Sequence, residues 1–185
     1  MTRIIAGRAG SLTLAVPDAG TRPTSDRVRE SVFGALESAG ILNGAAVVDL
    51  YAGSGALGLE SVSRGAASAD LVEKSPRAAA VTSANARIVA KAVDGAVIRV
   101  HKSAVDSFLR ASSATWDLAF LDPPYDLDDT ALRGALELLR PRMSTDGLAL
   151  VERATRSGRP TLPDGWQPER DRRYGDTTVW WLAAD

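Results

Sequence analysis

The sequence predicts a doubly wound α/β fold, in which a mostly parallel sheet of seven strands is covered by helices on both faces. Two observations lead to this prediction. From residue 45 onward, short apolar segments of strand length alternate with longer segments of helical periodicity, a pattern typical of parallel sheets buried on both sides. Residues 166–183 differ, because two strand-like segments flank Tyr174, Gly175 and Asp176. This predicts an antiparallel hairpin that closes the sheet.

The composition is that of an ordinary soluble globular protein. The 185 residues include 45% hydrophobic and 24% charged residues, and the net charge is −1. Cysteine is absent, so disulfides and thiolate metal sites are excluded, and we expect no metal. No apolar segment is long enough for a membrane span or a signal peptide, so we expect a cytoplasmic protein. The length fits one main domain, placed at residues 41–185, with residues 1–40 as an amino-terminal extension.

The amino-terminal extension should contain a hairpin followed by a helix. Residues 3–6 and 11–16 have the pattern of two short strands around a turn. Thr24 or Ser25 can cap a helix that ends near Gly40. Its apolar face would consist of Val28, Val32, Phe33 and Leu36.

The main domain should begin with five strands, before the final hairpin. They are expected at residues 45–50, 69–73, 96–100, 117–122 and 147–152. The first is followed by the glycine loop and a helix that reaches about Arg64. Ser75 supplies an N-cap, and Pro76 a first-turn proline, for a helix to about Lys91. A further helix should start after Asp128 or Asp129 and end at Leu139.

Polar residues follow the ends of four expected strands. They are Asp49, Glu73, residues 101–104 and residues 122–125. In doubly wound sheets, ligands bind at the carboxyl ends of the strands, where the strand order reverses. We therefore expect these residues to line one cleft. His101 is expected to pack at a strand end without a catalytic role.

Gly53, Gly55 and Gly58 form a G-x-G-x-x-G motif between a strand and a helix. This spacing alone fits a nicotinamide-dependent oxidoreductase, with Glu73 as the acid that binds the ribose. Asp49, four positions before Gly53, favours another ligand. A carboxylate beside the loop repels a pyrophosphate and attracts the sulfonium and ammonium groups of S-adenosylmethionine. Glu73 does not discriminate, because it can accept the ribose hydroxyls of either ligand.

Residues 120–126 have the sequence FLDPPYD and follow the fourth expected strand. Two consecutive prolines fix the backbone and remove N–H donors that would compete for their carbonyls. Asp122, a carbonyl of this turn and the ring of Tyr125 could then surround a planar amino group. We therefore expect the catalytic residues to be Asp122, Pro123, Pro124 and Tyr125.

These motifs, in this order, resemble one family. The glycine loop after Asp49, combined with D-P-P-Y, is similar to the amino-nitrogen methyltransferases of nucleic acids. With RIIAG and TRPTSDRVRESVF before them, they resemble the bacterial 16S rRNA guanine-N2 methyltransferases over nearly the whole chain. The resemblance implies a Rossmann-like class I methyltransferase that uses S-adenosylmethionine. Its substrate would be 16S rRNA in an assembled or assembling small ribosomal subunit, and it would act as a monomer.

The resemblance also implies roles for individual residues. Asp49, Gly53 and Gly55 would hold the methionine end of the cofactor, and Glu73 the ribose. Ser103 or a backbone N–H would contact the adenine, where the family often has an acid. The other expected cofactor-binding residues are Tyr51, Ser54, Lys74, Ala104 and Asp122. Arginine offers bidentate contacts to phosphate, and the expected RNA-binding residues are Arg3, Arg8, Arg22, Thr24, Arg27 and Arg29.

The expected reaction starts with a guanine flipped out of its RNA stack onto Tyr125. Its exocyclic N2 would donate hydrogen bonds to Asp122 and to the Pro123 carbonyl, so alignment and electrostatics would supply most of the acceleration. Three alternatives remain. A DNA adenine-N6 methyltransferase shares both central motifs, a nicotinamide-dependent oxidoreductase fits only the glycines, and a catalytically silent RNA-binding module would leave both motifs without a purpose.

Overall fold

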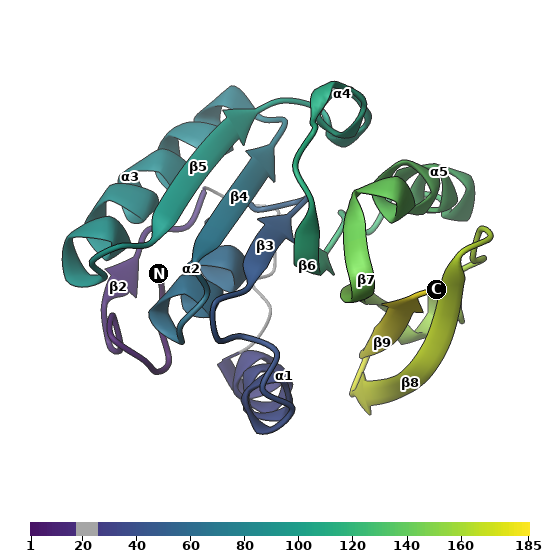
Figure 1. Cartoon of the computed structure of the whole chain (residues 1–185), viewed down its shortest axis with the longest axis horizontal. Coiled ribbons are helices and arrows are strands. Elements are labelled where there is room, and N and C mark those ends of the chain that lie inside the picture. The colour runs from purple at the N-terminus through teal and green to yellow at the C-terminus, as the bar shows by residue number, and fades with distance from the viewer. Residues whose placement is uncertain (18–25) are drawn as a thin grey trace.

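The computed structural model describes residues 1–17 and 26–185. Within these residues, Figure 1 shows a twisted seven-stranded sheet with the strand order β5-β4-β3-β6-β7-β9-β8. Strands β3 to β7 are parallel, and β9 is antiparallel to both of its neighbours. The predicted doubly wound fold and its final hairpin are confirmed. The strands are β3 (Ala46–Asp49), β4 (Ser68–Glu73), β5 (Val97–Lys102), β6 (Trp116–Leu121), β7 (Met143–Ala154), β8 (Trp166–Tyr174) and β9 (Thr177–Ala184).

Helices cover both faces of this sheet (Figure 1). One face carries α1 (Asp26–Ser38), α2 (Ala56–Ser63) and α3 (Pro76–Ala92), and the other carries α4 (Val105–Ala111) and α5 (Asp129–Leu139). Short 3₁₀ turns follow at η1 (Arg140–Arg142) and η2 (Thr155–Ser157). Helix α4 was not among the expected elements. Its apolar residues Val105, Phe108 and Leu109 nevertheless have the i, i+3, i+4 spacing of one helical face.

The expected caps of α3 and α5 are confirmed. The Ser75 side chain accepts a hydrogen bond from the Ala78 N–H (3.3 Å) at the start of α3. The Asp128 side chain accepts one from the Ala131 N–H (2.7 Å) at the start of α5. Each cap satisfies a backbone donor that has no partner inside its helix. The expected cap residues of α1, Thr24 and Ser25, lie outside the described residues.

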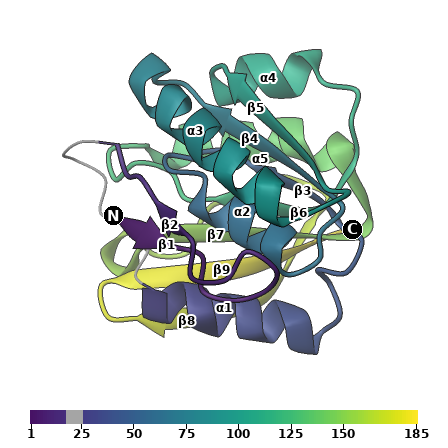
Figure 2. The same cartoon turned by 90° about the vertical axis from the view of Figure 1, so that its left-hand side faces the viewer.

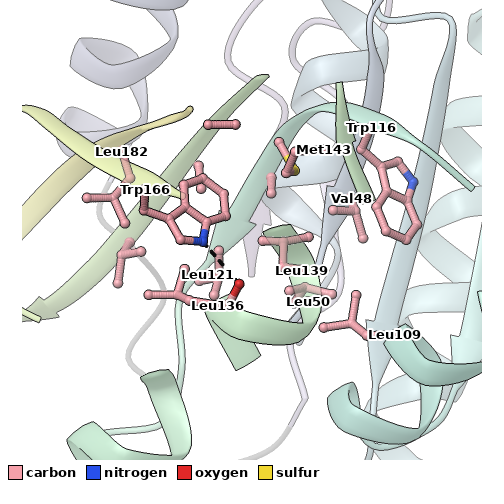
Figure 3. Close-up of a cluster of buried hydrophobic side chains, with 14 of the residues drawn as sticks. Val48, Leu50, Leu109, Trp116, Leu121, Leu136, Leu139, Met143, Trp166 and Leu182 are labelled. Atoms are coloured by element: carbon pink, nitrogen blue, oxygen red, sulfur yellow. Dashed lines mark hydrogen bonds between the residues drawn. The ribbon is translucent and has the colours of Figure 1, made fainter. Parts of the chain in front are cut away.

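The side chains of alternate strand positions form a core on each face of the sheet. The face under α4 and α5 contains Trp116 and Trp166 among its aliphatic residues (Figure 3). The Trp166 indole N–H donates to the Leu136 carbonyl (3.0 Å), so a large apolar ring is buried without losing its hydrogen bond. On the other face, Phe33 of α1 packs against Phe120 of β6, with ring centroids 5.7 Å apart.

The amino-terminal hairpin consists of β1 (Thr2–Arg3) and β2 (Thr13–Leu14), which lie beside α2 and α3 (Figure 2). Its apolar residues Ile4, Ala9 and Leu14 are buried in a cluster shared with those helices. Glu60 of α2 is fully buried and accepts hydrogen bonds from the Ile5 and Ala6 N–H groups (2.7 and 3.0 Å). The predicted hairpin is confirmed, and its apolar side chains share a core with the main domain.

Candidate functional site

The site is built where the strand order of the sheet reverses, between β3 and β6. β3 ends at Asp49, and Asp122 directly follows β6. β4 lies on the other side of β3 and ends at Glu73. Adjacent strands lie about 4.8 Å apart, so parallel pairing brings the three carboxylates to one edge of the sheet. We call this edge the carboxyl edge, and the opposite one the amino edge.

The glycine loop connects β3 to α2 in a conformation that requires glycine. Gly53 and Gly55 have φ values of 55° and 82°, in the left-handed region. Glycine is required at position 58 for another reason: a Cβ atom there would lie 2.2 Å from Cδ2 of Leu71. The third glycine therefore allows α2 to approach β4, while the first two shape the turn.

Asp49 lies beneath this loop. It is 1% exposed, and its Oδ2 accepts a hydrogen bond from the Gly58 N–H (3.2 Å). Its Oδ1 is buried without a hydrogen-bond partner in the described residues. Burial raises the pKa of Asp49 to about 7, and the neighbouring charges of Asp122 and Glu73 add to the rise. A cationic group placed here would relieve this unfavourable burial of negative charge.

Glu73 connects the end of β4 to the glycine loop. Its Oε2 accepts a hydrogen bond from the Gly53 N–H (3.0 Å), and its Oε1 accepts one from the Ser75 N–H (2.7 Å). The carboxylate is thus held in one orientation. Each oxygen retains a second lone pair for a ligand hydroxyl.

Two polar residues of α3 hold the glycine loop from the other side, and the motif gave no signal for either. The Thr82 hydroxyl donates to the Gly53 carbonyl (2.6 Å). The Asn85 amide donates to the Ser54 carbonyl (2.8 Å) and to the Ala15 carbonyl of the hairpin segment. Both are buried polar residues in an otherwise apolar helix face. That placement is the sequence signal by which they could have been found.

The end of β5 is the expected adenine side of the site. The Ser103 N–H donates to the Glu73 carbonyl (3.1 Å), so this backbone group is already used. The Ser103 hydroxyl donates to the Ala104 carbonyl (3.0 Å) and can still accept a hydrogen bond. Lys74 is exposed. Burial raises the pKa of the Tyr51 phenol to about 12, and its ring packs beside the α4 and α5 core.

His101 lies outside this group of residues. Its Nε2 is 2.8 Å from Oδ1 of the buried Asp70, and its ring stacks near Phe108. Arg99 and the Trp116 indole also donate to Asp70. Burial opposes ionisation of Asp70, but these hydrogen bonds outweigh it and hold the pKa of its carboxyl well below the usual range. His101 thus belongs to a packed polar cluster near the end of β5, which confirms the expected packing.

A pocket lies beside the D-P-P-Y turn at the carboxyl edge. Its walls include the turn itself, the end of β7, η2 and the start of β9, and its polar side chains are Asp122, Tyr125, Glu152, Arg153, Ser157 and Thr177. The turn is closed by a hydrogen bond from the Leu127 N–H to the Pro124 carbonyl (2.9 Å). Tyr125 is 62% exposed, so its ring is available to a ligand.

Among the described residues, Arg3, Arg8, Arg27 and Arg29 of the expected RNA-binding set do not form one surface. Arg3 and Arg27 are exposed, and Arg3 pairs with Asp26 at the start of α1. Arg8 donates to the Asp94 carbonyl (3.2 Å) in the loop before β5, which places it at the amino edge, opposite Asp122. Arg22 and Thr24 lie outside the described residues.

Arg29 is a correction to the expected RNA contacts. It is 1% exposed and donates to the Thr2 hydroxyl (2.8 Å) and to Asp26 (2.7 Å), and its NH1 lies 4.0 Å from Glu60. A guanidinium enclosed in this way does not reach a phosphate in solvent. The prediction was wrong because the helix periodicity placed Arg29 beside Val28 and Val32 without revealing that the hairpin covers that side of α1.

Membrane-spanning helices and metal-binding clusters are both absent from the described residues. No helix among them is long and apolar enough to cross a membrane. No group of three histidine, cysteine or acidic side chains in residues 1–17 and 26–185 is arranged to hold a metal ion.

Comparison with known proteins gives consistent results. The model of a family described as "Conserved hypothetical protein 95" matches residues 2–183. The "Ribosomal RNA small subunit methyltransferase D" of Escherichia coli K12 is 37% identical over 180 residues, covering 94% of this chain and 85% of that protein. The solved structure of Escherichia coli yhhF superposes with a TM-score of 0.84 at 34% identity, covering 100% and 98% of the two chains. At 12% identity, the fold is shared with a SAM-bound magnesium protoporphyrin IX methyltransferase from Synechocystis (TM-score 0.69, 91% and 87% coverage).

Proposed function

We propose a function from the premise that this chain belongs to the Conserved hypothetical protein 95 family and is similar to the small-subunit rRNA methyltransferase D of Escherichia coli. It methylates a guanine N2 of 16S rRNA. The proposed methyl donor is S-adenosylmethionine. The observation that carries the proposal is the meeting of Asp49, Glu73 and Asp122 beside the glycine loop, next to the D-P-P-Y pocket. A cluster of carboxylates suits a cationic donor, and the adjoining pocket suits a planar base.

The residues present fit the proposed cofactor. The Asp49 carboxylate has a buried oxygen without a partner and a pKa raised by burial, and both features favour an adjacent positive group. Glu73, fixed by the Gly53 and Ser75 N–H groups, would accept the ribose hydroxyls. Open space above Gly53 leaves its backbone accessible to a ligand. When bound, S-adenosylmethionine supplies a methyl group activated by a sulfonium.

The D-P-P-Y turn would bind and orient the target base. The exposed ring of Tyr125 would stack on the face of the flipped base, since base–aromatic stacking contributes about 1–3 kcal/mol. Asp122 and the Pro123 carbonyl would accept hydrogen bonds from the exocyclic amino group. These contacts orient its lone pair toward the donor, and Asp122 can hold the proton that the nitrogen loses. Positioning and fixed acceptors are thus the main catalytic contribution of this chain.

Glu152 supports guanine over adenine as the base. It lines the same pocket as Asp122 and Tyr125. The Watson–Crick edge of guanine carries N1–H and N2–H donors, which a carboxylate can accept together, whereas adenine presents an acceptor at N1. A pocket with two carboxylates therefore matches guanine better.

The test is to map methylated nucleotides in small-subunit rRNA from cells with and without this protein. We expect one guanine N2 methylation to disappear without the protein and to return with the wild-type chain, but not with Asp122→Ala. A matched control is Asp164→Ala, an exposed carboxylate remote from the site. Methylation of adenine in duplex DNA, or restored rRNA methylation by a folded Asp122→Ala variant, would refute the proposal.

The state of the substrate and of the protein can be tested with the same assay. We propose that the protein acts as a cytoplasmic monomer on an assembled or assembling small subunit. Purified protein should methylate small subunits that lack the modification faster than naked 16S rRNA. Size-exclusion chromatography with light scattering should give the mass of one chain, 19.5 kDa.

A further inference from the structure

The surface on the β8 side of the pocket carries four exposed arginines: Arg156, Arg159, Arg172 and Arg173. We name this set the carboxyl-edge arginine surface. Arg156 belongs to η2, Arg159 follows it, and the other two lie at the end of β8. Within the described part of the chain, none of the four forms an ion pair with an acidic side chain.

The strand register places Arg172 and Arg173 at the carboxyl edge, with their side chains on opposite faces of β8. β8 is antiparallel to β9, and β9 to β7, so β7 and β8 end at the same edge of the sheet. Thr178 of β9 pairs with Arg153 on one side and with Arg173 on the other. Two strand spacings amount to about 10 Å. Arg153 lines the pocket, so the backbone of Arg173 lies about 10 Å from the pocket wall.

Hydrogen bonds join η2 to the turn between β8 and β9. The Thr155 N–H donates to the Asp176 carbonyl (2.7 Å), and the Thr155 hydroxyl lies 3.0 Å from that of Thr178. Arg173 Nε donates to the Gly175 carbonyl of the same turn (2.9 Å). The loop after η2 is fixed at its other end, where the Thr161 N–H donates to Asp129 (3.3 Å). These hydrogen bonds therefore fix the backbone segments that carry the arginines.

This surface continues onto α1. The Tyr174 hydroxyl at the end of β8 donates to Ser31 Oγ of α1 (2.9 Å). Arg27 is exposed and lies one helical turn before Ser31, on the same side of the helix. The guanidinium of Arg172 lies 5.3 Å from the centre of the Tyr174 ring. Positive charge thus extends from the pocket rim past β8 to the start of α1.

We infer that the carboxyl-edge arginine surface binds the RNA backbone that flanks the target nucleotide, on the side of the pocket away from the cofactor. Arginine suits this partner, because its guanidinium contacts phosphate oxygens in a bidentate manner. Of the exposed acidic side chains at this edge, Asp126 and Asp128 lie on the D-P-P-Y side, and Asp176 of the β8–β9 turn is outnumbered by the four arginines, so phosphates would be drawn toward β8. Arg8, at the amino edge, lies too far to hold the same nucleotides. This inference rests on the proposed function, since it concerns the substrate of that pocket.

The test compares three double variants in the methyl-transfer assay: Arg156→Ala with Arg159→Ala, Arg172→Ala with Arg173→Ala, and a control pair. The control is Arg87→Ala with Arg110→Ala, two exposed arginines in the later halves of α3 and α4. The probe is the small-subunit rRNA or subunit that the wild-type protein methylates. We expect each of the first two pairs to raise KM for RNA about tenfold with kcat unchanged. Each should also reduce the dependence of log KM on log salt by about 1.4, for two phosphate contacts at about 0.7 each.

Several outcomes would overturn the inference. Unchanged KM and salt dependence in both arginine pairs would do so, as would an equal effect in the control pair. Arg172→Lys with Arg173→Lys keeps the charge and should restore most of the salt dependence. If the variant with Arg172→Ala and Arg173→Ala misfolds, the variant with Arg156→Ala and Arg159→Ala tests the inference by itself. Arg156 and Arg159 donate no hydrogen bond to the β8–β9 turn. Absence of methyl transfer by the wild-type protein would instead refute the proposed function.

Discussion

The Glu73 carboxylate and the Gly53 backbone are joined by a hydrogen bond of 3.0 Å. It connects the end of β4 to the loop that follows β3, so the two parts of the cofactor site predicted from sequence hold each other in place. Because the other carboxylate oxygen accepts the Ser75 N–H, the orientation of Glu73 is set before any ligand binds. Such preorganisation lowers the entropic cost of binding.

Replacing Glu73 with Gln should weaken the binding of S-adenosylmethionine. The amide offers one acceptor oxygen instead of two, so one of the two backbone N–H groups would face an NH₂ group. We expect at least a tenfold loss of affinity by calorimetry and a loss of about 1 kcal/mol in the free energy of unfolding. Glu169→Gln, an exposed change on β8, is the control. If the folded Glu73→Gln protein bound S-adenosylmethionine with wild-type affinity, the proposed contact between Glu73 and the ribose would be wrong.

The stability of the unliganded protein should depend on Asp49. Burial raises the pKa of its carboxyl to about 7 in the folded state, whereas an unfolded aspartate has a pKa of about 3.9. The folded state therefore binds a proton more tightly, and this group's contribution to stability is lost as pH rises from about 4 to about 7. The Asp49→Asn variant should not lose stability in this way, because an asparagine side chain does not ionise.

Urea unfolding of both proteins at pH 5 and pH 8 checks this effect of Asp49. Relative to the wild-type protein, Asp49→Asn should be more stable at pH 8 than it is at pH 5. The wild-type affinity for S-adenosylmethionine should move in the opposite direction and rise from pH 6 to pH 8, because the ionised carboxylate attracts the cationic ligand. Parallel stability profiles for the two proteins would contradict the raised pKa.

Tyr125 should matter for catalysis and not for stability. Its side chain is 62% exposed, so Tyr125→Ala removes little packing and should leave the melting temperature within about 1–2 °C. Loss of a stacking contact of about 1–3 kcal/mol predicts a fall in kcat/KM of about 10- to 100-fold. Tyr125→Phe keeps the ring and should retain most activity. Equal losses in the two variants would point to the hydroxyl instead of the stacking face.

Glu60 should hold the hairpin to the main domain. Its buried carboxylate accepts the Ile5 and Ala6 N–H groups and pairs with Arg64 (2.6 Å). Glu60→Ala leaves two backbone donors without their partner and leaves the enclosed Arg64 with Glu37 as its remaining carboxylate, which costs about 3–5 kcal/mol. We expect a clear drop in melting temperature and faster amide exchange at Ile5 and Ala6. Glu30→Ala, on the exposed side of α1, is the matched control, and slow exchange in Glu60→Ala would contradict this role.

Much of the fold and part of the site were predictable because their signals are local. Ser75 and Asp128 cap helices through residues three positions away, and the glycine loop and D-P-P-Y are continuous stretches. The family resemblance built on these stretches is confirmed by the matches over nearly the whole chain. Helix α4 was missed although Val105, Phe108 and Leu109 carried a helical pattern, because seven residues give a weak periodic signal.

The contacts of the basic residues were not predictable from local patterns. Arg29 and Arg27 are two positions apart on one helix, yet one is enclosed by the hairpin and the other is exposed. Arg8 and Arg3 share one hairpin segment, yet Arg8 reaches the Asp94 carbonyl at the amino edge. Arg173 comes near the pocket only because β8 and β7 end at the same edge. Each outcome depends on a partner many residues away in the chain.

The sequence by itself determined the order of the strands and of all the described helices except α4, and the chemical groups at the strand ends, including the aspartate before the glycine loop. Hydrophobic periodicity and turn residues act over a few positions, so one chain is enough to reveal them. Only the tertiary structure decided which charges are buried, paired or exposed. Asp49 has a pKa near 7 because three strand ends meet and water is excluded there, and that depends on the folding of the whole sheet.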